Sequence, residues 1–392
     1  MQFAKRLQAL DRNVFADMDR AKTSARNSGQ EIIDLSLGSS DLPVAETTIE
    51  AIATSLHDPT THGYLLHAGT KEFRAAAANW YTAKFNLAVD PETEVLPLIG
   101  SQEGTAHLPL AVLNPGDIAL LLDPGYPSHA GGVYLAGGNI YPMPLLVENN
   151  FLPVLEDIPA NVLVKAKMMV LSYPHNPTSA IAPLAFFQQA VEFCHQHDLV
   201  LVHDFPYVDL VFNERANIAP SILQADPNKE LSIEFFTLSK SYNMGGFRIG
   251  YAIGNQQLIT ALRQIKAVVD FNQYRGILNG AIAALSGSQT SVAETLATFK
   301  QRRDIFVRAL NEIGWQVSSP QATMYIWAKL PQPWHKSSVD FCTKLVAHTG
   351  VAASPGAGFG QSGEGYVRFA LVRDPDTLRR AAVKIKQFIS EK

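Results

Sequence analysis

Cysteine is scarce in this sequence of 392 residues, and Cys194 and Cys342 are the only two. Two cysteines cannot build a disulfide framework, so a reducing cytosol is the default environment and a cytoplasmic protein is expected. Long apolar runs are also missing, and without a stretch of 18 apolar residues a membrane span is not expected. Residues 1–12 carry charges of both signs and lack the apolar block of a signal peptide.

Positive charge is not in excess either. The formal net charge is −4, which argues against a nucleic-acid partner held by electrostatics. The HExxH and Cys/His spacings of metal sites do not occur, so no metal is expected. Gly-x-Ser-x-Gly and Walker patterns are missing, and the glycine-rich segment 355–365 does not connect a strand to a helix as a dinucleotide site requires. We expect this segment to be a mobile loop near the functional site.

The residues that are present fit a globular protein with an ample core. Hydrophobic residues make up 47% of the sequence and charged residues 17%. A chain of 392 residues is long for one simple domain, so two lobes are expected. We predict an N-terminal segment (1–45) that joins a small domain, a large domain (46–287) and a small C-terminal domain (288–392).

Apolar strands alternate with helices in the large domain, which predicts an α/β fold. Because the strands are continuously apolar, they indicate a mostly parallel sheet with helices on both faces. Ligands of such sheets bind at the carboxyl ends of the strands. The expected strands are 95–99, 118–122, 140–142, 168–172, 199–203, 235–238 and 251–253, and the expected helices are 71–84, 100–113, 128–137, 183–197 and 256–267.

The pattern changes after about residue 290 and predicts a smaller α+β domain. The N-terminal segment is expected to complete this domain with a surface helix at 5–25 and a strand at 32–37. The other expected elements are a long helix (291–313), a strand (324–328), a helix (338–348), a strand (366–370) and a final helix from Asp374.

Lys240 is the first candidate for chemistry. It lies where a β-prone run meets a glycine-rich turn, and a second cation, Arg248, follows it. A desolvated lysine beside another cation has a lowered pKa and attacks carbonyl groups. Lys240 could therefore hold pyridoxal phosphate (PLP) as a Schiff base and then act as a general base. A solvated surface lysine is the alternative, since most lysines are exposed.

Three polar residues follow apolar strands in the same region. Asp204 ends a buried strand, and its carboxylate could pair with the pyridine nitrogen and keep PLP an electron sink. Tyr207 and Asn176 could share hydrogen bonds with the phenolate oxygen of PLP. Each also has an ordinary explanation: a helix cap or turn for Asp204, a half-buried loop position for Tyr207 and an Asn-Pro turn for Asn176.

A phosphate site is expected close to these residues. Ser101 and Gln102 open a helix directly after a strand, where backbone N–H groups and the helix dipole attract an anion. The hydroxyls of Thr237 and Ser239 could reach the phosphate, and Arg248 would supply a counter-charge. Taken alone, Ser101 and Gln102 are better explained by a simple helix cap, and threonines such as Thr237 are common in strands.

Two further residues are candidates for binding the ring and the substrate. Tyr126, in the turn Asp-Pro-Gly-Tyr-Pro, could stack on the pyridine face or pack on the surface as a turn aromatic. Arg368 lies inside an apolar strand, where an arginine is costly unless it is paired. A carboxylate is the natural partner of its forked guanidinium. Both a substrate α-carboxylate and an internal Asp or Glu stay open at this point.

In their motifs and order, these residues resemble the fold-type-I PLP-dependent aminotransferases of class I/II, in the branch that holds aromatic, aspartate and LL-diaminopimelate aminotransferases. The resemblance runs from about residue 30 to the C-terminus, and the ordered set is far more specific than any one motif. The motifs are Asp-Leu-Ser-Leu-Gly (34–38), His-Gly-Tyr (62–64) with Gly69, Gly-Ser-Gln-Glu-Gly (100–104), Asp-Pro-Gly-Tyr-Pro (123–127), Asn-Pro-Thr (176–178), Asp-x-x-Tyr (204–207), Ser-Lys-Ser-Tyr-Asn-Met-x-Gly-Phe-Arg-Ile-Gly (239–250) and Tyr-Val-Arg-Phe-Ala (366–370).

This resemblance implies PLP as the cofactor, a seven-stranded sheet in the large domain and a homodimer with active sites at the subunit interface. It implies that Tyr64 reaches the cofactor phosphate of the neighbouring subunit. Gly38 would line the substrate pocket with its backbone, together with Asn176. Arg368 is implied for the substrate α-carboxylate, and Tyr126 for the face of the ring.

The sequence departs from the family pattern at a few positions. Thr237 stands where many relatives have serine, which keeps the hydroxyl, and Gly245 replaces an alanine or threonine. Tyr126 replaces the tryptophan of the aspartate-specific branch, which argues against a strict aspartate enzyme. Arg275 is a candidate for binding a second substrate carboxylate, although a surface or interface salt bridge is the preferred explanation.

We therefore expect an aminotransferase that moves an amino group between an L-amino acid and a 2-oxo acid by a ping-pong mechanism. A PLP lyase or decarboxylase is the alternative, because the bond that breaks depends on substrate orientation. A ligand-sensing regulator is disfavoured, because the 30 or so residues before the matched region are too few for a winged helix. Aromatic, dicarboxylic and diaminopimelate-type substrates all stay open.

Overall fold

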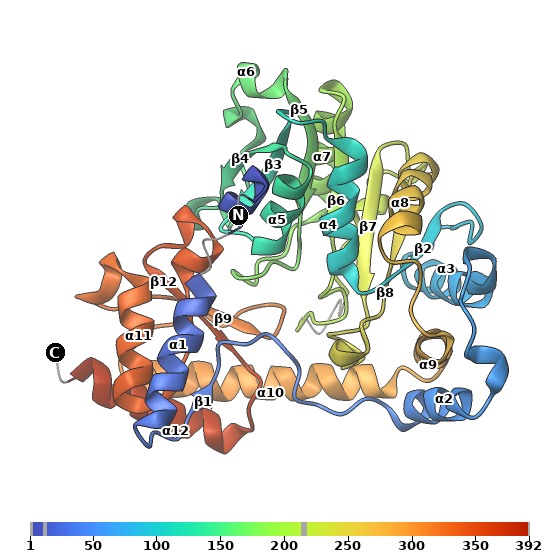
Figure 1. The fold of residues 1–392 in the computed structure, drawn as a ribbon. Helices are drawn as coiled ribbons and strands as arrows, with labels where there is room; N and C mark the ends of the chain where they lie inside the picture. Colours follow the sequence, from blue (N-terminus) through green and yellow to red (C-terminus); the bar gives the residue numbers. More distant parts are fainter. Residues whose placement is uncertain (1–2, 11–13, 213–217, 391–392) are drawn as a thin grey trace.

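A seven-stranded sheet forms the centre of the larger lobe in the computed structural model, which describes residues 3–10, 14–212 and 218–390 (Figure 1). Neighbouring strands are parallel except at β8, which runs antiparallel to both of its neighbours. The strands, in their order across the sheet, are β2 (Val95–Leu98), β8 (Gly250–Gly254), β7 (Ser232–Thr237), β6 (Val200–Asp204), β5 (Ala166–Leu171), β3 (Ile118–Asp123) and β4 (Asn139–Pro144). The predicted mostly parallel sheet is confirmed.

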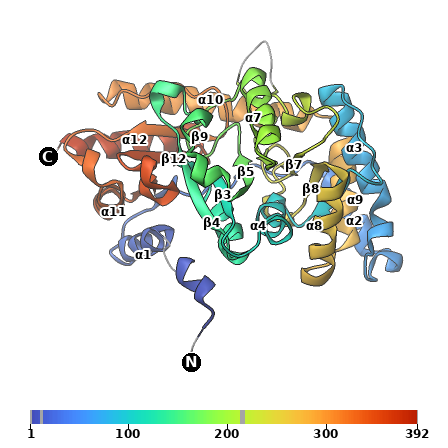
Figure 2. The ribbon, with the colours of Figure 1, turned by 90° about the horizontal axis from the view of Figure 1, so that it is seen from above.

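Helices cover both faces of this sheet, because alternate side chains of each apolar strand point to opposite sides. Leu201 belongs to the core under one layer of helices, and Val202 belongs to the core under the other. Figure 2 shows α7 on one side of the sheet and α4 and α8 on the other. The first layer holds α3 (Lys71–Phe85), α7 (Leu184–Gln196) and α9 (Arg275–Ser286), with α2 (Glu46–Leu56) packed on α9, and the second holds α4 (Ser101–Val112), α5 (Pro127–Leu135) and α8 (Gln256–Val269).

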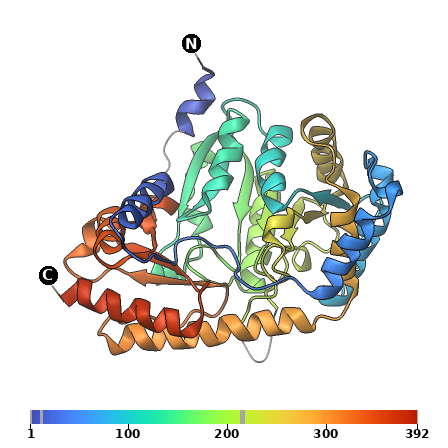
Figure 3. The same cartoon turned by 60° about the horizontal axis from the view of Figure 1, so that its bottom comes forward.

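The smaller lobe is built on an antiparallel sheet in the order β11 (Ser354–Pro355), β12 (Tyr366–Ala370) and β9 (Tyr325–Lys329). The N-terminal segment contributes to it, since β1 (Ile33–Asp34) pairs with β10 (Val351–Ala352) and α1 (Val14–Asn27) packs on α11 (Ser338–Thr349). Figure 3 shows the long α10 (Thr290–Glu312) running along both lobes, with α12 (Pro375–Ser390) beside it. This arrangement agrees with the predicted α+β lobe, while the domain limits 1–45, 46–287 and 288–392 stay a prediction.

Short helices connect these larger elements. They are α6 (Ala160–Leu163) and the 3-10 helices Lys5–Ala9, Pro59–Thr61, His67–Thr70, Val147–Asn149, Leu155–Asp157, Ile222–Gln224, Gly245–Phe247, Trp334–Lys336, Gly356–Phe359 and Gln361–Gly363. None of the helices in the described part of the chain is long and apolar enough to cross a membrane.

Some predicted elements differ from the structure. The helix expected at 5–25 is a 3-10 helix followed by α1, and residues 11–13 of that prediction lie outside the described residues. The strand expected at 32–37 is only two residues long, because the chain beyond Asp34 turns toward the space between the lobes. The sequence patterns did not predict α2 or α9.

Candidate active site

A cavity of about 410 Å³ lies between the lobes, at the carboxyl ends of β5, β6 and β7. Its position is where parallel sheets collect ligands. Apart from Tyr64 and Arg275, every candidate residue lines it: Gly38, Ser101, Gln102, Tyr126, Asn176, Asp204, Tyr207, Thr237, Ser239, Lys240, Arg248 and Arg368.

Lys240 lies in the turn that follows β7, and its side chain is half-buried. Its Nζ donates a hydrogen bond of 2.6 Å to the carbonyl oxygen of Gly38 and lies 5.8 Å from the ring centroid of Tyr207. No carboxylate of the described residues forms an ion pair with it. The Lys240 amine is therefore held by a neutral acceptor, and no ion pair with a described carboxylate has to break before the amine reacts with a carbonyl group.

Asp204 ends β6 at the floor of the cavity and is 4% exposed. Its Oδ2 lies 3.0 Å from Nε2 of His129, a buried residue of α5. Its Oδ1 is buried without a hydrogen-bond partner among the described residues. An unsatisfied buried carboxylate oxygen costs roughly 1–3 kcal/mol or more, so a protonated ring nitrogen in the cavity would remove a real penalty.

His129 was not singled out in the sequence. It follows Tyr126 by three residues in the first turn of α5, which faces the sheet. No spacing in the sequence points from His129 to Asp204, since they are 75 positions apart and meet only through the fold.

Tyr325 is a second residue that the sequence did not reveal. Its hydroxyl shares a 2.8 Å hydrogen bond with the hydroxyl of Tyr207. Burial alone would raise the pKa of Tyr325, but the Lys240 and Arg368 cations lower that pKa below its ordinary value. A Cβ on residue 38 would lie 2.0 Å from the Tyr325 hydroxyl, so only glycine fits at Gly38.

The N-terminus of α4 offers the uncapped N–H groups that the predicted anion site requires. The cap residue Gly100 has φ +78°, and no side chain caps the free N–H groups of the first turn. Arg248 donates hydrogen bonds to the carbonyl oxygens of Gly245 (3.1 Å) and Ile99 (3.4 Å), which hold its guanidinium beside this turn. Thr237 and Ser239 line the same part of the cavity, with their hydroxyl oxygens 2.8 Å apart.

Arg368 points from β12 into the cavity and is 6% exposed. It donates to Asn176 Oδ1 (2.8 Å), to the carbonyl oxygen of Ser36 (2.7 Å) and to Ser354 Oγ (3.2 Å). The ion pair with an internal Asp or Glu that the sequence left open is not found among the described side chains. The Nε–H group also has no hydrogen-bond partner among the described residues. The guanidinium therefore has a free donor and no described carboxylate to balance its charge.

Aromatic rings enclose the reacting part of the cavity. The ring of Tyr126 meets the His129 ring edge-on at 5.7 Å, and its hydroxyl donates to Gln102 Oε1 at 3.5 Å. Burial raises the pKa of Tyr126, so its hydroxyl stays protonated. His129 contacts both Tyr126 and Asp204, so the Tyr126 ring lies close to this carboxylate.

Tyr64 and Arg275 lie outside the cavity. Tyr64 is 96% exposed and touches the ring of Phe271 at 6.4 Å. Arg275 is half-buried at the start of α9, near Gly69. The role of Tyr64 in a neighbouring subunit stays a prediction, because a single chain cannot bring it to its own cavity.

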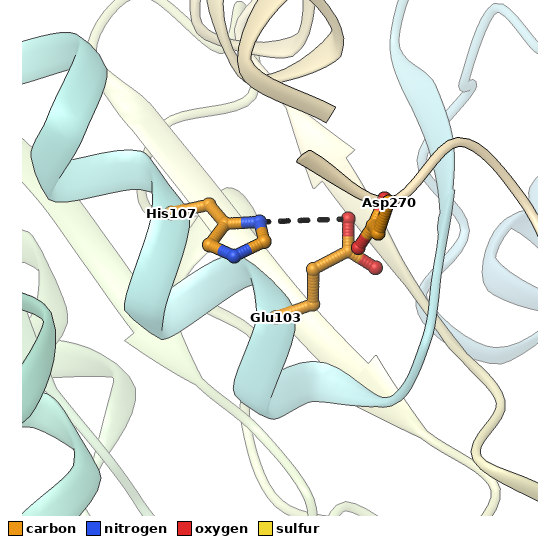
Figure 4. A group of neighbouring side chains, drawn as sticks. All are labelled: Glu103, His107 and Asp270. Carbon is orange, nitrogen blue, oxygen red and sulfur yellow. Dashed lines mark ion pairs between the residues drawn. The ribbon is translucent and has the colours of Figure 1, made fainter. Parts of the chain in front are cut away.

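A charged cluster lies behind the first turn of α4, where Glu103, His107 and Asp270 approach one another (Figure 4). Carboxylates and a histidine in this arrangement could suit a metal ion. However, the Nζ of Lys266 already lies 3.0 Å from both Glu103 oxygens and 3.0 Å from Asp270 Oδ1. This ammonium takes the place of a metal and ties α4 to α8.

Comparisons with known proteins agree with this geometry. The family model "Aminotransferase class I and II" matches residues 30–385. An LL-diaminopimelate aminotransferase from Dehalococcoides mccartyi is 42% identical over 391 residues, covering 100% of both chains. The structure of a probable N-succinyldiaminopimelate aminotransferase from Thermus thermophilus has 41% identity and a TM-score of 0.90 over 95% of this chain and 99% of that one.

A variant of the aspartate aminotransferase from Thermus thermophilus superposes with a TM-score of 0.91 at 25% identity, over 99% of each chain. The family implies PLP chemistry, and the relatives are enzymes of the transaminase class. The predicted fold and aminotransferase activity are thereby confirmed. The chain belongs to the aminotransferase class I and II family.

Proposed function

We propose that this aminotransferase binds pyridoxal 5'-phosphate in the cavity between its lobes and works by a ping-pong mechanism. The observation that carries the proposal is the buried Oδ1 of Asp204, which has no hydrogen-bond partner among the described residues, in the same cavity as an amine, Lys240, that no described carboxylate pairs with. A pyridine ring bearing an aldehyde and a phosphate would supply a donor for Asp204, a carbonyl group for Lys240 and an anion for the N-terminus of α4.

Each part of the cofactor would have its own set of residues. Asp204, supported by His129, would hold the ring nitrogen, and Tyr126 would cover the ring face. Asn176 and Tyr207 would contact the phenolate oxygen. The residues for the phosphate are Ser101, Gln102, Thr237, Ser239 and Arg248, with Tyr64 contributed to the site of a second subunit.

When bound, PLP supplies an aldehyde that condenses with amines and a ring that accepts the electrons released at the substrate Cα. The fork of Arg368 binds the α-carboxylate and so fixes the orientation of the Cα–H bond. The amine of Lys240 then takes the Cα proton as general base. The negative charge of Asp204 would hold a protonated ring nitrogen.

The outer wall of the cavity suggests the kind of amino acid. Asp19 and Lys22 of α1 line it, and Lys22 Nζ lies 2.8 Å from Asp19 and 3.1 Å from Asp34. Asp34 does not line the cavity, so the wall itself carries one carboxylate, Asp19, and one ammonium, Lys22, which favours a substrate whose far end carries both charges. LL-diaminopimelate, named for relatives such as the Dehalococcoides mccartyi enzyme, carries an ammonium and a carboxylate at its far end, and we propose it as the amino donor.

A second copy of this chain is the proposed partner. Tyr64 and Phe271 are exposed and in contact, and Leu66 is 60% exposed close by in the sequence. Exposed apolar groups of this kind are typical of protein interfaces. A homodimer would cover them and bring Tyr64 to the cavity of the other subunit.

A panel of amino donors tests the function and the substrate together. LL-diaminopimelate, lysine, aspartate and phenylalanine are each added to the PLP-loaded protein, and the cofactor spectrum and the 2-oxo acid product are followed. We expect one equivalent of 2-oxo acid per site, a spectrum restored only by 2-oxoglutarate, and the highest kcat/KM with LL-diaminopimelate. Continuous product formation without an oxo acid would indicate a lyase. Faster reaction of aspartate or phenylalanine would contradict the proposed donor.

A further inference from the structure

The glycine-rich loop between β11 and β12 reaches the cavity through Phe359. The ring of Phe359 lies 4.7 Å from the guanidinium carbon of Arg368, on which the ring of Tyr325 also packs at 4.3 Å. A planar guanidinium between two rings has its orientation restricted. The position of this loop therefore affects how the fork of Arg368 points into the cavity.

Two residues of the larger lobe hold the loop in place: Asp123, the last residue of β3, and Gly125 in the turn that follows. The carboxylate of Asp123 accepts hydrogen bonds from Ser362 N (3.2 Å to each oxygen) and from Ser362 Oγ (3.1 Å). The N–H of Gly125 donates to the carbonyl oxygen of Phe359 at 2.7 Å. These bonds cross from one lobe to the other on both sides of Gly360.

Gly360 shows how closely the loop fits this carboxylate. Its φ is +136°, and a Cβ there would lie 1.9 Å from Asp123 Oδ1. Only glycine allows the backbone to approach the carboxylate so closely. The loop was expected to be mobile, but these contacts fix it against the larger lobe.

Asp123 is 8% exposed and has no cation as a partner among the side chains that the structure describes. Burial raises the pKa of its carboxyl, while the bonds from Ser362 and from the Gln361 amide lower it. Burying the Asp123 carboxylate costs free energy, and the hydrogen bonds from the loop offset that cost.

We propose that Asp123 is a positioning residue that links the two lobes, holds Phe359 against Arg368 and so sets the fork that receives the substrate α-carboxylate. The inference rests on the proposed function, in which Arg368 binds that carboxylate. Asp123 itself does not line the cavity.

The test compares Asp123→Asn with Asp226→Asn in the PLP-loaded enzyme. Asp226 is a matched control, because it is 5% exposed and accepts backbone N–H bonds of 2.9–3.2 Å from Glu230, Leu231 and Ser232, away from the cavity. The new amide of Asp123→Asn faces the Ser362 N–H donor, so the link weakens. We expect KM for amino acids to rise about tenfold with kcat within about twofold, and no such change in Asp226→Asn.

Primary amines without an α-carboxylate separate a positioning role from a general structural one, because structural damage to the site would slow their reaction as well. Their slow kcat/KM should be the same in Asp123→Asn and wild type, because they do not use Arg368. Amide hydrogen exchange in peptides covering 356–365 should become faster in Asp123→Asn and stay unchanged in Asp226→Asn. Ser362→Ala, which removes only the hydroxyl donor, should raise KM by about twofold to threefold and serves if Asp123→Asn does not fold.

Two results would overturn the inference. One is an unchanged KM for amino acids in a folded Asp123→Asn or Ser362→Ala protein. The other is an equal loss of activity on amino acids and on simple amines. Failure of the proposed function is distinguishable, because wild-type protein would then take up no PLP, while the exchange experiment would still report whether Asp123 holds the loop.

Discussion

The guanidinium of Arg368 is buried, packed between two rings and without a carboxylate partner in the described part of the chain. Its bonds to Asn176, Ser36 and Ser354 are all to neutral acceptors. A buried cation with only neutral partners gains strongly from an anionic ligand. This is the physical reason to assign the substrate α-carboxylate to it.

We expect Arg368→Lys to raise KM for the amino donor roughly tenfold to hundredfold, because lysine cannot form the two parallel bonds of the fork. Steady-state kinetics with a saturating oxo acid measure the effect. Arg74→Lys is the control, since Arg74 is 2% exposed, pairs with Glu92 and does not line the cavity. An unchanged KM in Arg368→Lys would remove this arginine from the site.

The sequence predicted those site residues that stand in recognisable local contexts. Lys240 and Asp204 follow apolar strands, and Arg368 interrupts one, so each is conspicuous without any knowledge of the fold. His129 and Tyr325 are not conspicuous, because their importance comes from partners far away in the sequence, Asp204 and Tyr207. Such pairs depend on how the strands and helices are stacked, which local patterns do not encode.

Among the elements, α9 was missed for a reason that concerns glycine. Gly276 and Gly280 lower the helix propensity of α9. In the fold, however, a Cβ on Gly280 would lie 2.5 Å from Cγ1 of Ile52 in α2. The same glycine that weakens the local signal allows the two helices to pack closely, so tertiary contact outweighs propensity.

The pair Glu103–Lys266 joins α4 to α8 directly behind the proposed phosphate site. Burial raises the pKa of Glu103 to about 7, against the opposing effect of Lys266. Because this pKa is above its unfolded value, the contribution of Glu103 to stability is fully present at acidic pH and is lost as the pH rises through about 7.

We therefore expect Lys266→Met to lower the free energy of unfolding by about 3–5 kcal/mol at pH 8, since two carboxylates lose their cation. The loss should be smaller at pH 5, where the unpaired Glu103 can bind a proton. Urea unfolding at both pH values measures it. The double variant Glu103→Gln with Lys266→Met should recover part of the loss at pH 8. An equal loss at the two pH values would show that Glu103 does not titrate as described.

For the molecule as a whole, the exposed position of Tyr64 makes the proposed site incomplete in one chain. If each subunit lends Tyr64 to the other, two differently inactivated chains can complement each other. A mixed dimer of Tyr64→Ala and Lys240→Ala chains contains one site with both residues intact.

Unfolding and refolding the two variants together should restore about a quarter of wild-type turnover, because half of the dimers are mixed and each has one of two sites. Variants refolded separately provide the baseline. Activity of the mixture equal to the mean of the separate variants would mean that Tyr64 does not act across an interface.

The covalent link between Lys240 and PLP is the central claim, and borohydride reduction followed by peptide mass spectrometry tests it most directly. We predict that reduction fixes one pyridoxyl phosphate group per chain on the peptide that contains Lys240, and none in Lys240→Ala. As a control, Lys71→Ala, which changes an exposed lysine at the start of α3, should label like wild type. Protein that takes up no PLP, or that carries the label on another lysine, would contradict the account.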